Sequence, residues 1–342
     1  MKIEASSISK ILLVRTDRIG DVVLSLPMLP VLKKRFPSAS ISVLVRPYTR
    51  ELVEHHSCVD EVILWDETKG MKPYVELLRE KRFDMAIVPY PRFNLAMITY
   101  LAGIPIRVGT GFRWYSFLFN KRIYEHRKDA KRHEVEYNLN LLTTIGIDPM
   151  PETVFEFSVS DEVQKRVDDR LASDHVGKFA VLHAGSGGSA RDWSLENFAR
   201  LGDAVRKEFG LTIVLTGGKN ESELTTRLSS LMNGPSMDYT GAFSITELGA
   251  LFSRASLFVA NSTGPLHIAA MVGTPVVAFY PPIIQCSPVR WGPYTKKKRV
   301  FTADNTHCSL CKGGPCISNV CMDQITVEQV ISGMRELLNE KK

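Results

Sequence analysis

Residues 10–21 read KILLVRTDRIGD, an apolar run that ends in charged residues and a glycine. The run is typical of a buried strand, and the glycine permits a tight turn into the helix-like segment that follows. Similar runs recur at 41–46 (ISVLVR), 61–65 (EVILW) and 85–90 (MAIVPY), with helix-like stretches between them. This alternation predicts a parallel sheet covered by helices.

The alternation begins again in the second half of the chain. Its apolar runs are FAVLHAGSGG (179–188), TIVLTGG (212–218), LFVANSTG (257–264) and PVVAFYPP (275–282). Residues 149–162 contain prolines and lack helical periodicity, as linkers between domains do. Because 342 residues exceed what one hydrophobic core usually organises, we expect two α/β domains that bind ligands where their strands end.

Composition indicates an ordinary globular protein, since 44% of the residues are hydrophobic and 23% are charged. The apolar run near the N-terminus, Ile11 to Val14, is too short for a signal peptide or a membrane span, so we expect a cytoplasmic protein. Cys58 and Cys286 are isolated and the other four cysteines crowd together, unlike a secreted disulfide framework.

The net charge of +6 belongs to the first half of the chain. Residues 1–150 carry 23 Lys and Arg against 17 Asp and Glu, whereas residues 151–342 carry 20 of each. The excess is concentrated at 107–133, which contains eight basic residues and only two acidic ones. This segment is either a solvated basic surface or a site for an anionic partner. We expect no nucleic-acid partner.

Asp21 follows Gly20 at the first strand-to-helix turn, so its carboxylate is expected at the start of the helix and at the ligand-binding edge. Backbone N–H groups at a helix start favour the ionised form, which suits a general base. The alternative interpretation is a plain helix cap. Pro27 and Pro30 indicate that the helix is kinked or restarts near Ser25.

A glycine-rich loop, GSGGSARDW at 185–193, follows the strand predicted at 179–183. Small residues such as Gly185 and Ser186 let backbone N–H groups approach phosphate oxygens, and Arg191 adds a positive charge. The loop does not match the GxxxxGK[ST] pattern, so it is not a P-loop. A purely structural turn is the alternative.

A second loop at a strand-to-helix junction is NSTGPLHIAA at 261–270. Ser262 and Thr263 can cap the following helix and Gly264 lets a ligand approach, so the helix start offers a diphosphate-sized anion site. His267, one turn further, either binds the same ligand or packs in the core.

Glu221 and Glu223 follow the strand and the TGG turn at 216–218. Acidic side chains at this distance commonly accept hydrogen bonds from ribose hydroxyls in nucleotide sites. Two surface carboxylates at the start of a helix would give the same pattern.

Taken together, RTDRIGD, HAGSGGSARDW, VLTGG, TGAFSITELGALFSRASLFVANSTGPLHIAA and GTPVVAFYPP resemble glycosyltransferase family 9, the heptosyltransferases of lipopolysaccharide core assembly. The resemblance covers nearly the whole chain in the same order. It implies a GT-B fold of two Rossmann-like domains facing a central cleft, with the acceptor on residues 1–155 and the donor on residues 156–342. It also implies inverting transfer from ADP-heptose without a metal or cofactor.

Matched by position, the resemblance makes Asp21 the catalytic base. It places five residues at the donor: Arg191, Ser262, Thr263, Gly264 and His267. From the loop patterns described above we also expect Gly185, Ser186 and Glu221 there. Arg191 stands where the family usually has Lys, and Ser262 where characterised heptosyltransferases often have Asp. The second departure leaves another nucleotide sugar as an alternative donor.

An anionic lipopolysaccharide core acceptor would suit the basic segment at 107–133. The side chains expected to bind it are Arg18, Arg113, Lys121 and Arg122. Aromatic residues of the same segment would rest against the inner membrane in a peripheral contact. They are Trp114, Tyr115, Phe117 and Phe119.

Cys308, Cys311, Cys316 and Cys321 lie close enough in sequence to surround Zn²⁺, but only one CxxC pair is present. We expect reduced cysteines in a loop, without a metal. Two other functions stay open: a sugar-nucleotide epimerase or hydrolase, which would need further carboxylates and a His, and a non-catalytic sugar-nucleotide-binding protein. Product formation would separate them.

Overall fold

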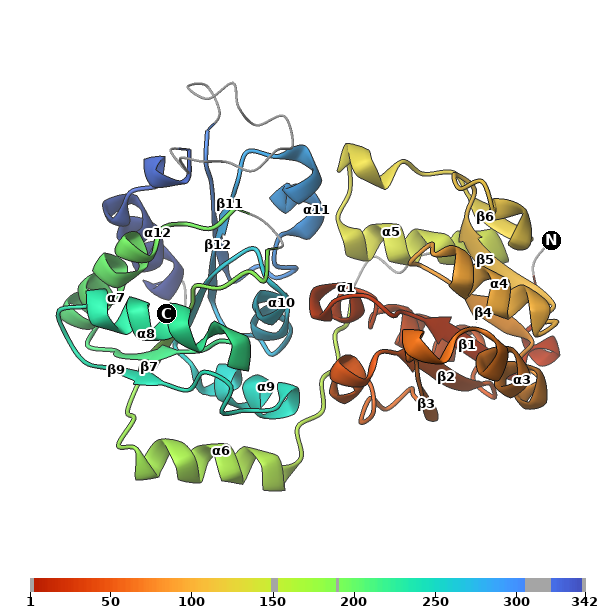
Figure 1. Ribbon diagram of the computed structural model, residues 1–342, viewed down its shortest axis with the longest axis horizontal. Helices are drawn as coiled ribbons and strands as arrows, with labels where there is room; N and C mark the ends of the chain where they lie inside the picture. The colour runs from red at the N-terminus through yellow and green to blue at the C-terminus, as the bar shows by residue number, and fades with distance from the viewer. Residues whose placement is uncertain (1–2, 149–152, 189–190, 305–320, 340–342) are drawn as a thin grey trace. The chain divides into compact units, whose positions relative to one another are not determined.

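The computed structural model describes residues 3–148, 153–188, 191–304 and 321–339. The backbone divides into two compact units, Met1–Ser158 and Val159–Lys342, called unit 1 and unit 2 below. Within the described residues, each unit holds one six-stranded sheet with helices packed against it (Figure 1). The prediction of two α/β domains is confirmed.

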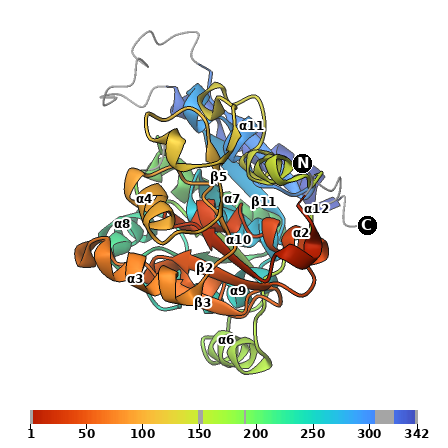
Figure 2. The same ribbon diagram turned by 90° about the vertical axis from the view of Figure 1, so that its right-hand side faces the viewer.

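All strands of unit 1 run parallel, in the spatial order β3-β2-β1-β4-β5-β6. They are β1 (Lys10–Val14), β2 (Ser40–Val45), β3 (Glu61–Leu64), β4 (Met85–Ile87), β5 (Ile106–Thr110) and β6 (Lys121–Ile123). The helices are α1 (Ile19–Val23), α2 (Met28–Arg35), α3 (Lys72–Lys81), α4 (Phe93–Leu101) and α5 (Glu134–Asn140). Figure 2 shows α3 and α4 on one side of this sheet and α2 on the other.

Unit 2 repeats the plan with the order β12-β11-β10-β7-β8-β9, again all parallel. Its strands are β7 (Phe179–His183), β8 (Thr212–Leu215), β9 (Ser236–Asp238), β10 (Leu257–Asn261), β11 (Val276–Tyr280) and β12 (Lys298–Thr302). Its helices are α6 (Asp161–Ser173), α7 (Leu195–Phe209), α8 (Ser222–Leu231), α9 (Ile245–Arg254), α10 (Gly264–Met271), α11 (Pro288–Trp291) and α12 (Val327–Asn339).

The central strands owe their apolar sequences to burial on both faces. Every residue of β7, β10 and β11 is buried, as is typical of parallel sheets covered by helices. In unit 2 one large apolar cluster joins β7, β8, β10 and β11 to α7 and α12, with Trp193 among its members. The cores therefore hold the strand ends, and the loops that follow them, in fixed positions.

The sequence analysis did not predict four of the strands, β5, β6, β9 and β12. Their sequences (IRVGT, KRI, SMD and KRVFT) are polar or interrupted by glycine. Three of them lie at sheet edges, where one side of the strand has no neighbour and the apolar signal is weak. The basic segment 107–133 consequently contains strand residues of β5 and β6.

The break predicted near Ser25 is confirmed. Helix α1 ends at Val23, and α2 begins at Met28 after Pro27. Because a proline cannot donate a backbone hydrogen bond inside a helix, the chain leaves the first helix early and turns. The short α1 therefore presents its first turn, with Asp21, beside the end of β1.

Candidate active site

Asp21 lies in the first turn of α1, directly beyond β1 and at the carboxyl end of the unit 1 sheet. The residue that precedes α1 is Arg18, which is the N-cap and forms no side-chain cap hydrogen bond. Asp21 is therefore not the capping residue. Its side chain is 20% exposed, so a ligand in solution can reach the carboxylate.

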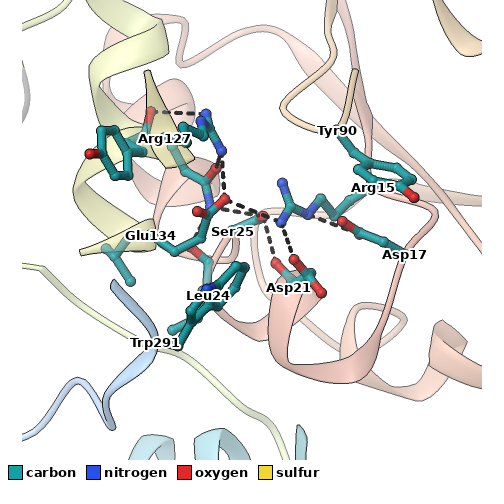
Figure 3. Close-up of polar contacts among 12 residues, drawn as sticks. Arg15, Asp17, Asp21, Leu24, Ser25, Tyr90, Arg127, Glu134 and Trp291 are labelled. Atoms are coloured by element: carbon teal, nitrogen blue, oxygen red, sulfur yellow. Dashed lines mark hydrogen bonds and ion pairs between the residues drawn. The ribbon is translucent and has the colours of Figure 1, made fainter. Parts of the chain in front are cut away.

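A buried arginine holds this carboxylate. Arg15 is 2% exposed and donates from Nη2 to Oδ1 of Asp21 over 2.8 Å, as Figure 3 shows. Its Nε lies 3.0 Å from Oδ1 of Asp17, and Nη2 lies 3.5 Å from Oε1 of Glu134. One guanidinium thus faces three carboxylates. Charge-assisted contacts of this kind are strong and directional.

Asp17 is a second buried carboxyl group beside Asp21, and Tyr48 donates to its backbone oxygen over 2.7 Å. Burial raises the pKa of Asp17 to about 7, against the opposing attraction of Arg15, and the neighbouring Asp21 and Glu134 raise it further. Burial therefore favours the protonated form of this carboxyl group.

Glu134 connects the same cluster to α5. Its Oε1 accepts a hydrogen bond from Nη1 of Arg127 over 2.5 Å, and that Nη1 also donates to Oδ1 of Asn138 over 3.0 Å. Asn138 reaches the hydroxyl of Ser25, and that hydroxyl donates to the backbone oxygen of Asp21 over 2.8 Å. Sequence patterns missed these partners, which come from a helix distant in the chain.

In unit 2 the two predicted loops follow neighbouring strands, β7 and β10. The fully buried Asn261 ties them together, donating from Nδ2 to the backbone oxygen of Ala184 over 2.7 Å. Its Oδ1 accepts from the backbone N–H of Trp193 over 2.8 Å. Asn261, which the sequence analysis did not single out, fixes both ends of the glycine-rich loop.

The structure brings Glu221 and Gly185 together. A Cβ built on Gly185 would lie 2.0 Å from Oε1 of Glu221, so only glycine permits this approach. Oε2 of Glu221 accepts from the backbone N–H of Gly218 over 2.7 Å. Glu223, in contrast, is exposed in the first turn of α8 and is not among the residues of these contacts.

Two further ionisable groups surround this carboxylate. Burial lowers the pKa of His183 to about 4, so its imidazole is neutral, and its Nδ1 lies 3.0 Å from the hydroxyl of Thr216. Burial raises the pKa of Asp192 to about 6, with Glu221 adding to the rise and a hydrogen bond from Ser186 opposing it. Ser186 is buried and Arg191, beside Asp192, is half-buried.

The second loop differs from expectation in its capping. Thr263 is the N-cap of α10 but its side chain makes no cap hydrogen bond. Ser262 instead shares a hydrogen bond with the hydroxyl of Tyr280 on β11. Gly264 begins α10, and His267 is buried in its first turn. The side chain of Thr263 therefore does not cap the helix start.

The predicted acceptor residues spread over unit 1. Arg18, Arg113 and Arg122 are exposed, and Lys121 is half-buried on β6. Arg122 also donates from Nε to the backbone oxygen of Phe119 over 2.8 Å.

The prediction of a membrane contact is wrong for two of the four aromatic residues. Tyr115 is 5% exposed and its hydroxyl donates to the backbone oxygen of Pro91, while Phe119 is fully buried against Gly109. Both side chains face the core because the chain turns inward between β5 and β6. Trp114 and Phe117 are exposed, as expected.

Of the cysteine cluster, Cys308, Cys311 and Cys316 lie outside the described residues, and Cys321 is buried. In the part of the chain that the structure describes, no three His, Cys, Asp or Glu side chains are placed to hold a metal ion. No helix in that part is long and apolar enough to span a membrane.

The sequence and the structure both match known proteins. The family model described as "Glycosyltransferase family 9 (heptosyltransferase)" matches residues 74–321. This chain belongs to glycosyltransferase family 9. A putative glycosyltransferase of Haemophilus influenzae is 28% identical over 336 residues, which is 94% of this chain and 95% of that protein.

Two relatives have more specific names. Lipopolysaccharide heptosyltransferase 2 of Salmonella typhimurium is 26% identical over 351 residues, 97% of this chain and 99% of that one. The structure of the E. coli ADP-heptose lipopolysaccharide heptosyltransferase II has a TM-score of 0.81 at 24% identity, covering 97% of this chain and 99% of its own. The family-9 chain is accordingly a glycosyltransferase with the two-domain α/β fold, and its GT-B resemblance is confirmed.

Proposed function

We propose that this protein moves heptose from ADP-heptose to an anionic acceptor of the lipopolysaccharide inner core. The names of two relatives include heptosyl transfer and lipopolysaccharide, and one of them also includes ADP-heptose. The observation that carries the proposal is the carboxylate of Asp21, which is accessible at the carboxyl end of the unit 1 sheet and held by the buried Arg15. Such a group suits proton abstraction from a sugar hydroxyl.

In this mechanism Asp21 takes the proton of the acceptor hydroxyl as the hydroxyl oxygen forms a bond to the anomeric carbon. The bond from that carbon to the donor phosphate oxygen breaks on the opposite face, so the configuration inverts and ADP leaves with the bonding electrons. The charge that develops on ADP needs a fixed counter-charge. Arg191 and the start of α10 would provide it without a divalent metal.

Unit 2 would bind the donor. The diphosphate would lie against Gly185, Ser186 and Arg191 and against the start of α10 at Ser262, Thr263, Gly264 and His267. Glu221 would accept hydrogen bonds from the ribose hydroxyls. Support comes from the way Asn261 joins the two loops and from the close approach of Glu221 to Gly185.

Unit 1 would bind the acceptor through Arg18, Arg113, Lys121 and Arg122. The protein would work at the cytoplasmic face of the inner membrane, where Trp114 and other exposed aromatic rings would touch the lipid. Trp114 is 75% exposed and stacks on Phe93 with ring centroids 5.0 Å apart. Phe117 is also exposed, at 62%. Exposed aromatic rings beside basic side chains favour anionic membrane surfaces.

Two variants test the assigned roles. Asp21→Asn keeps the size of the side chain and removes the base, so turnover should fall by about 10² to 10⁴ with donor affinity unchanged. Arg191→Ala should weaken ADP-heptose binding as well as turnover, because phosphate contacts exist before and during transfer. Transfer is followed by mass spectrometry of the acceptor, and donor affinity by calorimetry. Near-normal turnover of Asp21→Asn at saturating acceptor would refute the mechanism.

Donor identity has its own experiment. Another nucleotide sugar is the second candidate donor, because Ser262 stands where characterised heptosyltransferases often have Asp. A thermal-shift series with ADP-heptose and common UDP-, GDP- and ADP-sugars separates the candidates. A ligand present at 100 times its Kd stabilises a protein by about 2.7 kcal/mol. Binding without any transfer product would instead indicate a non-catalytic binding protein.

A further inference from the structure

The polar contacts around Asp21 form a closed ring, which Figure 3 displays in part. The carboxylate of Asp21 binds Arg15, and the same arginine nitrogen faces Oε1 of Glu134. Glu134 accepts a hydrogen bond from Arg127, which also donates to the side-chain amide of Asn138 on α5. Asn138 donates to the hydroxyl of Ser25, and that hydroxyl donates to the backbone oxygen of Asp21, which closes the ring.

This ring holds Asp21 by its side chain and by its backbone at once. Asn138 also donates from Nδ2 to the backbone oxygen of Leu24 over 2.9 Å, in a fully buried contact. The helix α5 therefore fixes both the arginine that binds the carboxylate and the turn that carries it. A helix of only five residues such as α1 has little intrinsic stability, so these tertiary contacts are needed to keep its first turn in place.

The buried charges oppose opening of the ring. Arg15 is 2% exposed and Glu134 is 1% exposed, so neither can leave its partner without placing an uncompensated charge in the interior. The carboxylates outweigh the effect of burial and raise the pKa of Arg15, which stays a cation. The ionisable groups that face Asp21 are Arg15, Asp17 and Tyr48.

We propose that Arg15 and Glu134 are positioning residues for the base in the transfer reaction. Arg15 binds Oδ1 of Asp21 and so fixes the carboxylate that takes the proton of the acceptor hydroxyl, while Glu134 fixes the orientation of the Arg15 guanidinium. The inference rests on the proposed function of Asp21 as the base. Its physical content is preorganisation, since misplacing a reacting group by about 1 Å costs roughly 10² in rate.

A purely structural cross-link between α1 and α5 would use the same contacts, so the test must separate turnover from stability and binding. Arg15→Lys keeps the positive charge and loses the fork of donors, whereas Arg15→Met keeps the length and loses the charge. Glu134→Gln keeps an acceptor for Arg127 and removes one charge. Arg254→Lys is the matched control, because Arg254 makes a two-bonded contact with Asp168 on the surface of unit 2.

The assay measures kcat and KM for donor and acceptor across pH, on variants whose folding is checked by thermal unfolding. With both substrates saturating, kcat should fall about 10-fold in Arg15→Lys and about 100-fold in Arg15→Met, with either KM changed less than about threefold. Arg254→Lys should match the wild type.

Other outcomes decide against the proposal. Folded Arg15 variants with kcat near the wild-type value, or with raised KM and unchanged kcat, would overturn it. If neither Arg15 variant folds, Glu134→Gln decides: a fall in kcat of about fivefold at unchanged KM supports positioning, and unchanged kcat refutes it. Activity of Asp21→Asn would refute the proposed base itself. An inactive Asp21→Asn beside a fully active Arg15→Met would refute only the positioning role.

Discussion

Replacing Asp17 with Asn should make unit 1 more resistant to heat at alkaline pH and leave it nearly unchanged at acidic pH. Burial raises the pKa of Asp17 from 3.8 to about 7, although Arg15 lies 3.0 Å away and opposes the rise. Arg15 is shared with Asp21 and Glu134, and Arg127 pairs with Glu134, so two cations serve three carboxylates. Burial is therefore expected to prevail.

The sign follows from proton binding. Between pH 4 and 7 the unfolded chain has released the Asp17 proton and the folded unit retains it, so the stability contributed by this group falls as pH rises through that window. Asn resembles the protonated carboxyl group at every pH. Between pH 5 and 7 the difference in pKa changes the free energy of unfolding by about 2 kcal/mol in favour of the variant. At roughly 2–4 °C per kcal/mol, the advantage in Tm should reach about 5 to 10 °C by pH 8.

The measurement is the Tm of wild type and variant between pH 5 and 8 at constant ionic strength. Asp168→Asn is the control, because the hydrogen bond from Arg254 lowers the pKa of Asp168 and removal of this exposed carboxylate should give no alkaline gain. A Tm difference that is constant across the range, or that turns against Asp17→Asn as pH rises, would show that the ion pair with Arg15 outweighs burial.

Two further predictions concern ligand binding. Gly185→Ala should reduce ADP-sugar affinity at least tenfold with little loss of turnover at saturation, because the new Cβ would displace the carboxylate of Glu221; unchanged affinity by calorimetry would remove Glu221 from the donor site. A triple charge-removal variant should raise the acceptor KM more than the donor KM, and less so at high salt, because exposed charges are screened over about 8 Å at physiological ionic strength. The residues replaced in this variant are Arg113, Lys121 and Arg122. An equal loss of donor affinity would show that they do not belong to a separate acceptor site.

Local patterns were sufficient for the parts of the fold that are buried on both faces. β1, β7, β10 and β11 appear in the sequence as unbroken apolar runs because no residue in their interiors meets water. Edge strands such as β6 and β12 meet water on one side and carry basic residues, so their sequences resemble surface loops. The same weakness produced the error at Tyr115 and Phe119, whose burial depends on where β5 and β6 pair.

The sequence by itself determined two α/β domains of parallel sheet, the break between α1 and α2, and the place of Asp21 beyond the first strand. These features follow from the spacing of apolar residues, glycine and proline along a short stretch of chain, which is local information. Only the tertiary structure decided which charges meet. Arg15 finds Glu134 on α5, and Asn261 joins two loops of unit 2, because folding brings together segments that have no relation in sequence. Burial then fixes those pairs, since an unpaired charge or amide in the interior costs several kcal/mol.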